Sequence, residues 1–337
     1  MQYLFRNIIL IFFFFIASQN GFAENLLEDD FFNGFSAKFE LCTLGIATNS
    51  NIIPFTADDY EERKNNNQNI SSLTKNSHFV FAGSSDLLFN IEYTFESGTV
   101  LYLGTPFYDD ARDGVTFGVE KEYDNFISDF AFFANGNEVW KNPYLTNTDR
   151  TVTDEFNIGF VYKLIEIYQT GFSTSFKSKY RYIEDDDIGK EEIDLKRDGF
   201  IHTIKFDYDH QFNTDDEEPP NNIVYSLTYN HADMEGESNS YYSLLFGLKG
   251  TYWYEDISVG LMTNIEGRKY KKSNPIFNIK KDENILTNGV MITFNNLGKS
   301  GNWYLRGGFS VVNVFSNIDF YESDSLMCLA SIGYNFQ

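Results

Sequence analysis

Apolar and polar residues alternate along the last segment of the chain, from Leu326 to Gln337. Successive side chains of a β-strand point to opposite faces, so a period of two predicts a strand. An apolar face toward lipid and a mixed face toward the lumen are typical of a strand in a transmembrane β-barrel. The apolar row consists of Leu326, Cys328, Ala330, Ile332, Tyr334 and Phe336, and the other row becomes small or polar toward the C-terminus.

The aromatic end of this strand is a candidate assembly signal. Tyr334 and Phe336 form a Tyr-x-Phe ending that resembles the signal by which outer-membrane barrels are recognised for insertion, although Gln337 follows the phenylalanine. The barrel-assembly machinery is therefore an expected partner.

The same alternation recurs along the chain and predicts an all-β fold, an antiparallel up-and-down transmembrane barrel of about fourteen strands, within a range of 12 to 16. A long polar segment from about residue 47 to 85 is expected to be a loop, with a short strand at most at 78–81, and residues 135–153 form a second long loop. The predicted strands are 35–43, 87–95, 99–105, 115–123, 126–132, 156–162, 172–182, 200–212, 223–229, 242–254, 257–270, 286–294, 303–315 and 326–337.

The connections between these strands alternate between shorter and longer segments. Short periplasmic turns and longer external loops are typical of bacterial barrels, and an even strand number places both ends of the barrel in the periplasm. A soluble β-sandwich gives no reason for this alternation.

The N-terminus carries the only long apolar run, Ile8 to Ile16, preceded by Arg6. Nine residues are too few to cross a bilayer as a helix, which needs about 20. A basic residue, an apolar run and the small residues Gly21 and Ala23 predict a secretory signal peptide at 1–23, with cleavage after Ala23. The alternative is a buried N-terminal helix. The expected organisation is thus an exported chain with a barrel at 24–337, located in the outer membrane.

Charge and cysteine content bear on the expected partners and on disulfide formation. The net charge of −23 argues against nucleic acid as a partner, because phosphates require a basic surface. Cys42 and Cys328 fall on opposite rows of strands that become neighbours when the barrel closes, so we expect no disulfide between them.

Charged residues on the predicted inward rows are the candidate pore residues. Lys177, Lys179 and Arg181 lie on one strand, and Lys205, Asp207 and Asp209 lie on the next. A charge on the lipid face would cost about 2–4 kcal/mol, so both rows are expected to face the lumen, within reach of cross-strand or diagonal pairing. They either form a charged pore wall or an ion-pair ladder that fills a narrow barrel. The remaining inward candidates are Glu92, Glu120 and Arg268.

The excess acidic residues lie in the predicted loops and turns, for example at 184–187 and 215–218. They either attract cations to the mouth or are solvated charge without a further role.

Motifs of enzymes are absent from the sequence. It contains no Gly-x-Ser-x-Gly and no His-Glu-x-x-His, and its four histidines are not spaced for a metal. We therefore expect no enzyme activity, no cofactor and no metal site.

Five short segments together resemble one family of Gram-negative proteins that is catalogued as a domain of unknown function. They are 84–87 (Ser-Ser-Asp-Leu), 104–106 (Gly-Thr-Pro), 138–144 (Glu-Val-Trp-Lys-Asn-Pro-Tyr), 274–277 (Asn-Pro-Ile-Phe) and 318–321 (Ile-Asp-Phe-Tyr). The resemblance implies an outer-membrane-type β-protein and carries no known activity.

Two functions remain open. The first is a passive, porin-like channel for ions or small solutes. The second is a non-conducting barrel whose acidic loops act in adhesion, partner binding or envelope structure. Either protein would contact outer-membrane lipid and lipopolysaccharide.

Overall fold

A computed structural model describes residues 34–54, 67–105, 114–212, 219–298 and 301–336. The predicted signal peptide, its cleavage after Ala23, and Gln337 lie outside the described residues. No helix in the described part of the chain is long and apolar enough to cross a membrane.

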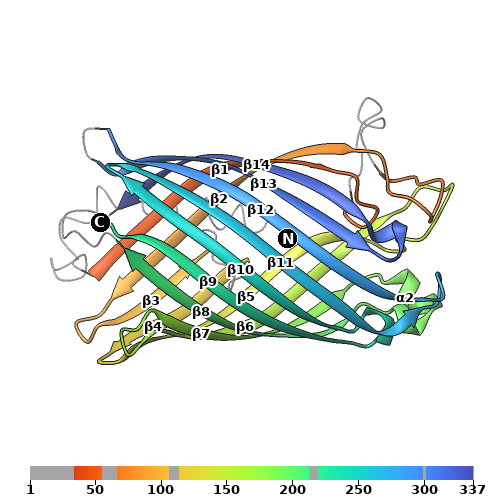
Figure 1. The fold of residues 1–337 in the computed structure, drawn as a ribbon, viewed down its shortest axis with the longest axis horizontal. Helices are drawn as coiled ribbons and strands as arrows, with labels where there is room; N and C mark the ends of the chain where they lie inside the picture. The colour runs from red at the N-terminus through yellow and green to blue at the C-terminus, as the bar shows by residue number, and fades with distance from the viewer. Residues whose placement is uncertain (1–33, 55–66, 106–113, 213–218, 299–300, 337) are drawn as a thin grey trace, which may run out of the picture.

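The chain forms one closed antiparallel barrel in which each strand pairs with its neighbours in sequence and β1 pairs with β14 (Figure 1). The predicted fold and the number of fourteen strands are confirmed. The strands are β1 (Phe35–Thr48), β2 (Val80–Thr94), β3 (Thr99–Gly104), β4 (Val115–Tyr123), β5 (Phe126–Trp140), β6 (Val152–Ile167), β7 (Phe172–Ile183), β8 (Gly199–Phe212), β9 (Asn221–Met234), β10 (Tyr241–Tyr254), β11 (Ile257–Asn274), β12 (Ile279–Leu297), β13 (Trp303–Ser316) and β14 (Ser323–Phe336).

Several strands extend further than the sequence pattern predicted. β1 continues to Thr48, and β2 begins at Val80, so the predicted short strand at 78–81 is the start of β2 itself. β5 continues to Trp140 into a segment expected to be a loop, and β12 begins at Ile279 rather than at 286. In β5 and β12 the added residues 135–138 and 280–284 are polar or glycine on both faces, so the alternation that marks a strand disappears there while the backbone pairing continues.

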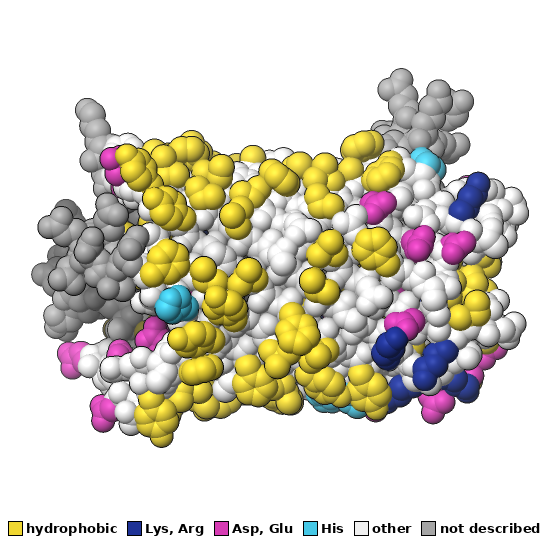
Figure 2. All heavy atoms as spheres, viewed as in Figure 1, with side chains coloured by type: hydrophobic (Ala, Val, Ile, Leu, Met, Phe, Trp, Pro, Cys, Tyr) yellow, Lys and Arg dark blue, Asp and Glu magenta, His cyan; other side chains and the backbone are white. Residues whose placement is uncertain are grey.

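The outer wall carries a belt of exposed apolar side chains (Figure 2). Leu41 on β1, Phe206 on β8 and Phe246 on β10 are each more than half exposed. Large exposed apolar surface is unfavourable in water, and a belt that encircles a barrel is the surface that hydrocarbon covers.

The two ends of the barrel differ. Ala37 pairs with Phe336, so the described ends of the chain lie at the same end, with the short turns such as the one at Gly98. The opposite end, which we call the loop end, carries longer connections, and their described residues form four short helices. These are α2 (Asp187–Glu191), η4 (Ile193–Leu195), η5 (Glu237–Asn239) and η6 (Asp319–Tyr321).

Side chains reinforce the closure of the barrel by β1 and β14. The buried Glu40 carboxylate on β1 accepts a hydrogen bond from the Tyr304 hydroxyl of β13 at 2.7 Å, and Arg306 Nη1 lies 3.3 Å from the same carboxylate. Cys328 is paired with Gly45 rather than with Cys42, and both cysteines are free, as predicted.

Aromatic residues gather where β14 ends. The rings of Phe39 and Phe336 are 5.7 Å apart, and those of Tyr334 and Trp303 are 4.9 Å apart. Phe336 is half exposed on the outer wall, while Asn335 is paired with Lys38 on the inward row.

Replacing Phe336 with serine should therefore reduce membrane assembly more than replacing Asn335 with serine. Only Phe336 contributes to the outer aromatic cluster, and burying a phenylalanine side chain contributes about 1.5–3 kcal/mol. The yield of heat-modifiable, membrane-extracted protein measures this difference. Equal yields for the two variants would contradict a role of Phe336 in barrel assembly.

Candidate functional site: the lumen wall and the external mouth

The structure places the predicted basic row of β7 on the inner face. Phe176 and Tyr182 on the alternate row are exposed on the outer wall, so Lys177, Lys179 and Arg181 point into the barrel. Arg181 forms an ion pair with Glu155 of β6, with Nη2 and Oε2 2.5 Å apart.

The charged row of β8 also faces inward, but it does not meet the row of β7 as expected. Asp207 is paired with Ser173, and Lys177 is paired with Thr203, so the basic and acidic groups lie at different depths. The Nζ of Lys205 lies 3.2 Å from Asp207 of the same strand. The β7–β8 register therefore places the basic residues of β7 opposite uncharged residues of β8, and not directly opposite Asp207 and Asp209.

Asp207 and Asp209 also bind polar residues of β9. Ser226 donates a hydrogen bond to Asp207 at 2.5 Å, and Asn222 donates one to Asp209 at 3.2 Å. These bonds hold both carboxylates against the wall, in the part of the barrel near the chain ends.

The other predicted pore residues also participate in contacts of the wall. Arg268 binds Glu266 of the same strand through two hydrogen bonds of 2.8 and 2.9 Å. Glu92 accepts a hydrogen bond from Asn90 at 2.5 Å, and Glu120 is paired with Asp129 across β4 and β5.

Some charged side chains of the inner wall are buried, and others are partly exposed to solvent. Asp129 is fully buried beside Tyr102, whose hydroxyl donates a hydrogen bond to it, and Lys163 Nζ lies 3.7 Å away. In contrast, the side chains of Lys205 and Asp207 are 20% and 24% exposed. Water therefore reaches charges on the β8 wall, while the β3–β6 wall is packed.

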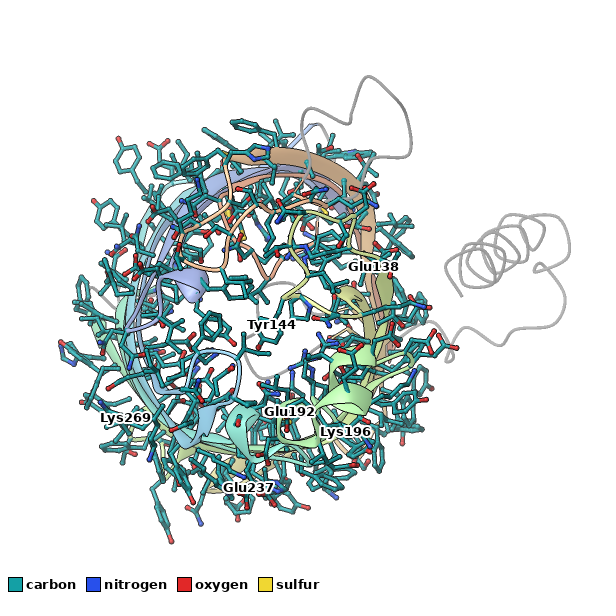
Figure 3. All side chains as sticks on the ribbon, turned by 90° about the vertical axis from the view of Figure 1, so that its right-hand side faces the viewer. Glu138, Tyr144, Glu192, Lys196, Glu237 and Lys269 are labelled. Atoms are coloured by element: carbon teal, nitrogen blue, oxygen red, sulfur yellow. The ribbon has the colours of Figure 1, made fainter. Side chains whose placement is uncertain are left out.

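At the loop end, aromatic residues from distant loops form one cluster across the mouth. Tyr144, from the loop between β5 and β6 (141–151), packs against Phe277 and Phe320 with ring centroids 5.9 and 5.3 Å apart. Its hydroxyl lies 2.5 Å from that of Tyr321, and Asn274 of β11 donates to Tyr321 at 2.9 Å. Figure 3 looks into this end and shows Tyr144 near the middle of the opening.

This cluster joins opposite walls, because β5 and β11 are six strands apart in a ring of fourteen. We call the β5–β6 loop with its contacts to Asn274, Phe277, Phe320 and Tyr321 the mouth bridge. Burial in the bridge raises the pKa of Tyr321 well above its usual value, so this hydroxyl stays protonated and can donate or accept.

Arg150 anchors the bridge to the loop between β1 and β2 (49–79). It is fully buried, and its Nη1 donates to the carbonyl oxygens of Asn51 at 2.8 Å and Pro143 at 2.9 Å. Its Nη2 donates to the carbonyl of Asn67, and its guanidinium stacks 4.4 Å from the Trp140 ring centroid. Burial lowers the pKa of Arg150 to about 10, so it remains charged at neutral pH.

The rim near α2 carries exposed ion pairs. Lys141 Nζ lies 2.8 Å from Asp185, and the hydrogen bond from Lys141, with one from Lys190, lowers the pKa of Asp185. The pair therefore supports the folded loop above the usual carboxyl pKa, and this contribution is lost as the pH falls through the lowered value. Solvent screens exposed pairs of this kind, so their contribution to stability is small.

Sequence patterns do not mark the residues of the bridge as a site. The segments 138–144, 274–277 and 318–321 contain most of them and carry a family resemblance without a chemical motif, and nothing in the sequence distinguishes Arg150 from other loop residues. Among the described residues, no group of three or more His, Cys, Asp or Glu side chains is placed to hold a metal ion.

Replacing Arg150 with methionine should loosen both loops. At least three carbonyl oxygens would lose a donor, at a cost of about 1–3 kcal/mol each. External protease should therefore cut segments 49–79 and 141–151 at least about tenfold faster, the factor that about 1.4 kcal/mol gives. Lys190→Met, which removes an exposed cation from the same end, is the control. Equal cleavage rates in both variants would show that Arg150 does not anchor the loops.

Comparison with known proteins adds a family. No curated protein matches the chain. Among solved structures, a Pseudomonas aeruginosa FadL homologue is 11% identical with a TM-score of 0.45, covering 90% of each chain. The outer membrane channel DcaP of Acinetobacter baumannii is 10% identical with a TM-score of 0.37, covering 90% of this chain and 98% of its own.

A BenF-like porin from Pseudomonas fluorescens is also 10% identical, with a TM-score of 0.38, and covers 91% of this chain and 99% of its own. Similarities at this level say nothing about solutes or sites. The family match is more extensive, because it spans residues 34–335 and so nearly the whole described barrel. The chain belongs to the family described as protein of unknown function (DUF2860).

Proposed function

We propose that this protein is a passive channel of the outer membrane for ions or small solutes. The observation that carries the proposal is the partial exposure of inward-facing charges: the side chains of Lys205 and Asp207 are 20% and 24% exposed, and that of Arg268 is 29% exposed. Water that reaches charges on a lumen wall provides a path for hydrated solutes. A barrel filled by its own side chains would bury such groups.

The membrane location rests on the wall itself. Hydrocarbon offers no hydrogen-bond partners to backbone N–H and C=O groups, and a closed barrel pairs these groups between its own strands. The exposed apolar belt matches a lipid environment. The predicted signal peptide would direct export.

The mouth bridge would restrict passage. It links walls six strands apart and places Tyr144 near the middle of the opening, so a solute must pass beside it. Deeper in the barrel, the basic row of β7 and the carboxylates of β8 lie at different depths. A passing ion would therefore meet the two sets of charges one after the other.

Tyr144→Ala should raise single-channel conductance in planar bilayers. The change removes the ring that contacts Phe277 and Phe320 and the hydroxyl that binds Tyr321, and so opens the bridge. Tyr168→Ala, at an exposed position outside the bridge, is the matched control. Equal conductance of the Tyr144 variant, its control and the unmodified protein would exclude the bridge as a constriction.

Asp207→Asn/Asp209→Asn should shift ion preference toward anions. The change removes two negative charges from the inner wall, one of them the Asp207 carboxylate 3.2 Å from Lys205, and charge in a confined pore acts at short range with little screening. Reversal potential across a salt gradient measures the shift, with Asp187→Asn/Asp233→Asn at exposed rim positions as the control. An unchanged reversal potential in a conducting protein would rule out these carboxylates as selectivity determinants.

A wild-type barrel that inserts fully and does not conduct would favour the second function. The loop end would then be the functional part, as a surface for adhesion, for a partner or for lipopolysaccharide.

A further inference from the structure

Methionine gathers on one part of the inner wall. The chain has five methionines, and three of them, Met262 on β11, Met291 on β12 and Met327 on β14, lie within the wall that β11 to β14 form. The alternate rows of these strands face lipid, because Leu261 and Leu326 are exposed on the outer wall. Side chains alternate between the two faces of a strand, so the three methionines point into the barrel.

Strand register brings these residues together in two adjoining rows that continue onto β1 (Figure 1). One row consists of Met262, Gly289, Ser310, Met327 and Ile46. The other row, two residues nearer the chain ends, consists of Gly260, Met291, Gly308, Leu329 and Leu44. We call the large apolar members of the two rows the methionine wall: Leu44, Ile46, Met262, Met291, Met327 and Leu329.

The methionine wall is partly open to solvent. Met262 is 38% exposed, and the other five members are half-buried. A Cβ atom on Gly289 would lie 2.9 Å from the terminal methyl carbon of Met262, and one on Gly308 would lie 2.9 Å from the sulfur of Met291, so these side chains lie along the wall. Exposed apolar surface is a candidate contact for an apolar ligand, and the flexible, polarizable methionine side chain adapts to ligands of different shape.

Lys249 of β10 borders the methionine wall. It is paired with Met262, it is exposed, and it lies on the inward row, because Leu248 on the alternate row is exposed on the outer wall. Among the described residues, no carboxylate forms an ion pair with Lys249, whereas the inward Lys205 and Arg268 are each bound to one. The Lys249 ammonium can therefore bind an anionic group of a solute.

Carboxylates lie on the other side of Lys249. Asp209 of β8 is paired with Val224 of β9, and Val224 is paired with Lys249. Two strand spacings separate β8 from β10, which is about 10 Å, so Asp209 would repel a bound anion from that side. An anion held by Lys249 would thus extend its apolar part away from β8, over Met262 and the methionine wall.

We propose that Lys249 and the methionine wall form a subsite for amphipathic organic anions. The negatively charged head binds the Lys249 ammonium through charge-assisted hydrogen bonds, and the apolar body lies against Met262 and Met291. This inference deepens the channel function and rests on it, because the solute reaches the subsite through the lumen. A small hydrophilic anion lacks the apolar contact and should pass without saturable binding.

Methyl NMR of the protein in lipid nanodiscs, labelled with carbon-13 at the methionine methyl groups, tests the subsite. The probe is hexane-1-sulfonate, whose head stays charged. The Met262 and Met291 signals should shift saturably, and the buried Met234 near the loop end is the internal control. Methanesulfonate, which has no apolar chain, and hexyltrimethylammonium, which has the opposite charge, should give no saturable shift. No saturable shift with hexanesulfonate, or an equal one with hexyltrimethylammonium, would overturn the subsite.

Variants of Lys249 test the charged half of the subsite. Lys249→Gln should weaken hexanesulfonate binding at least about tenfold, because a hydrogen bond to a charged group is lost, and Lys249→Arg should retain binding. Lys280→Gln is the matched control, since Lys280 is also an exposed lysine without a described ion-pair partner but lies at the start of β12 near the loop end. Equal weakening by both glutamine variants would contradict a local site.

Potassium chloride conductance of the unmodified protein, measured in parallel, separates the subsite from the channel. A protein that shows the saturable shifts and does not conduct would refute the channel and support the subsite. A protein that conducts and shows no saturable shift would refute the subsite and leave the channel standing.

Discussion

The structure depends on one constraint, the cost of an unpaired backbone group in hydrocarbon. A sheet meets this constraint in lipid only if its first and last strands pair, and here β1 and β14 do so from Ala37–Phe336 to Thr48–Ser325. The buried Glu40 with Tyr304 and Arg306 reinforces this closure from inside.

Closure also determines what the interior can do. Alternation sends apolar side chains to lipid and directs the charged rows of β7 and β8 inward, where Arg181 pairs with Glu155 and Lys205 with Asp207. Part of the wall is packed around Asp129 and Tyr102, and part remains wet. The loops then cross the mouth at Tyr144, anchored through Arg150. In the proposed channel, access to the lumen would depend on loop structure as much as on barrel size.

The sequence predicted the features that depend on a period of two. The row from Leu326 to Phe336 identified the closing strand, and the same pattern identified fourteen strands and the inward face of Lys177 and Asp207. It did not predict that the β7–β8 register would offset the rows of these two residues, because register is decided by turn geometry and not by alternation. It also could not predict Arg150, whose partners are backbone carbonyls of residues 51, 67 and 143 and leave no pattern in side-chain chemistry.

The central claim is that the lumen is a water-filled path narrowed at its mouth. Liposome swelling with uncharged sugars of increasing size tests it most directly, since uptake then depends on open space and not on charge. We expect proteoliposomes to swell with the smallest sugars and to stop swelling above a size limit that Tyr144→Ala increases. Proteoliposomes that contain correctly inserted protein and swell with none of the sugars would contradict the claim.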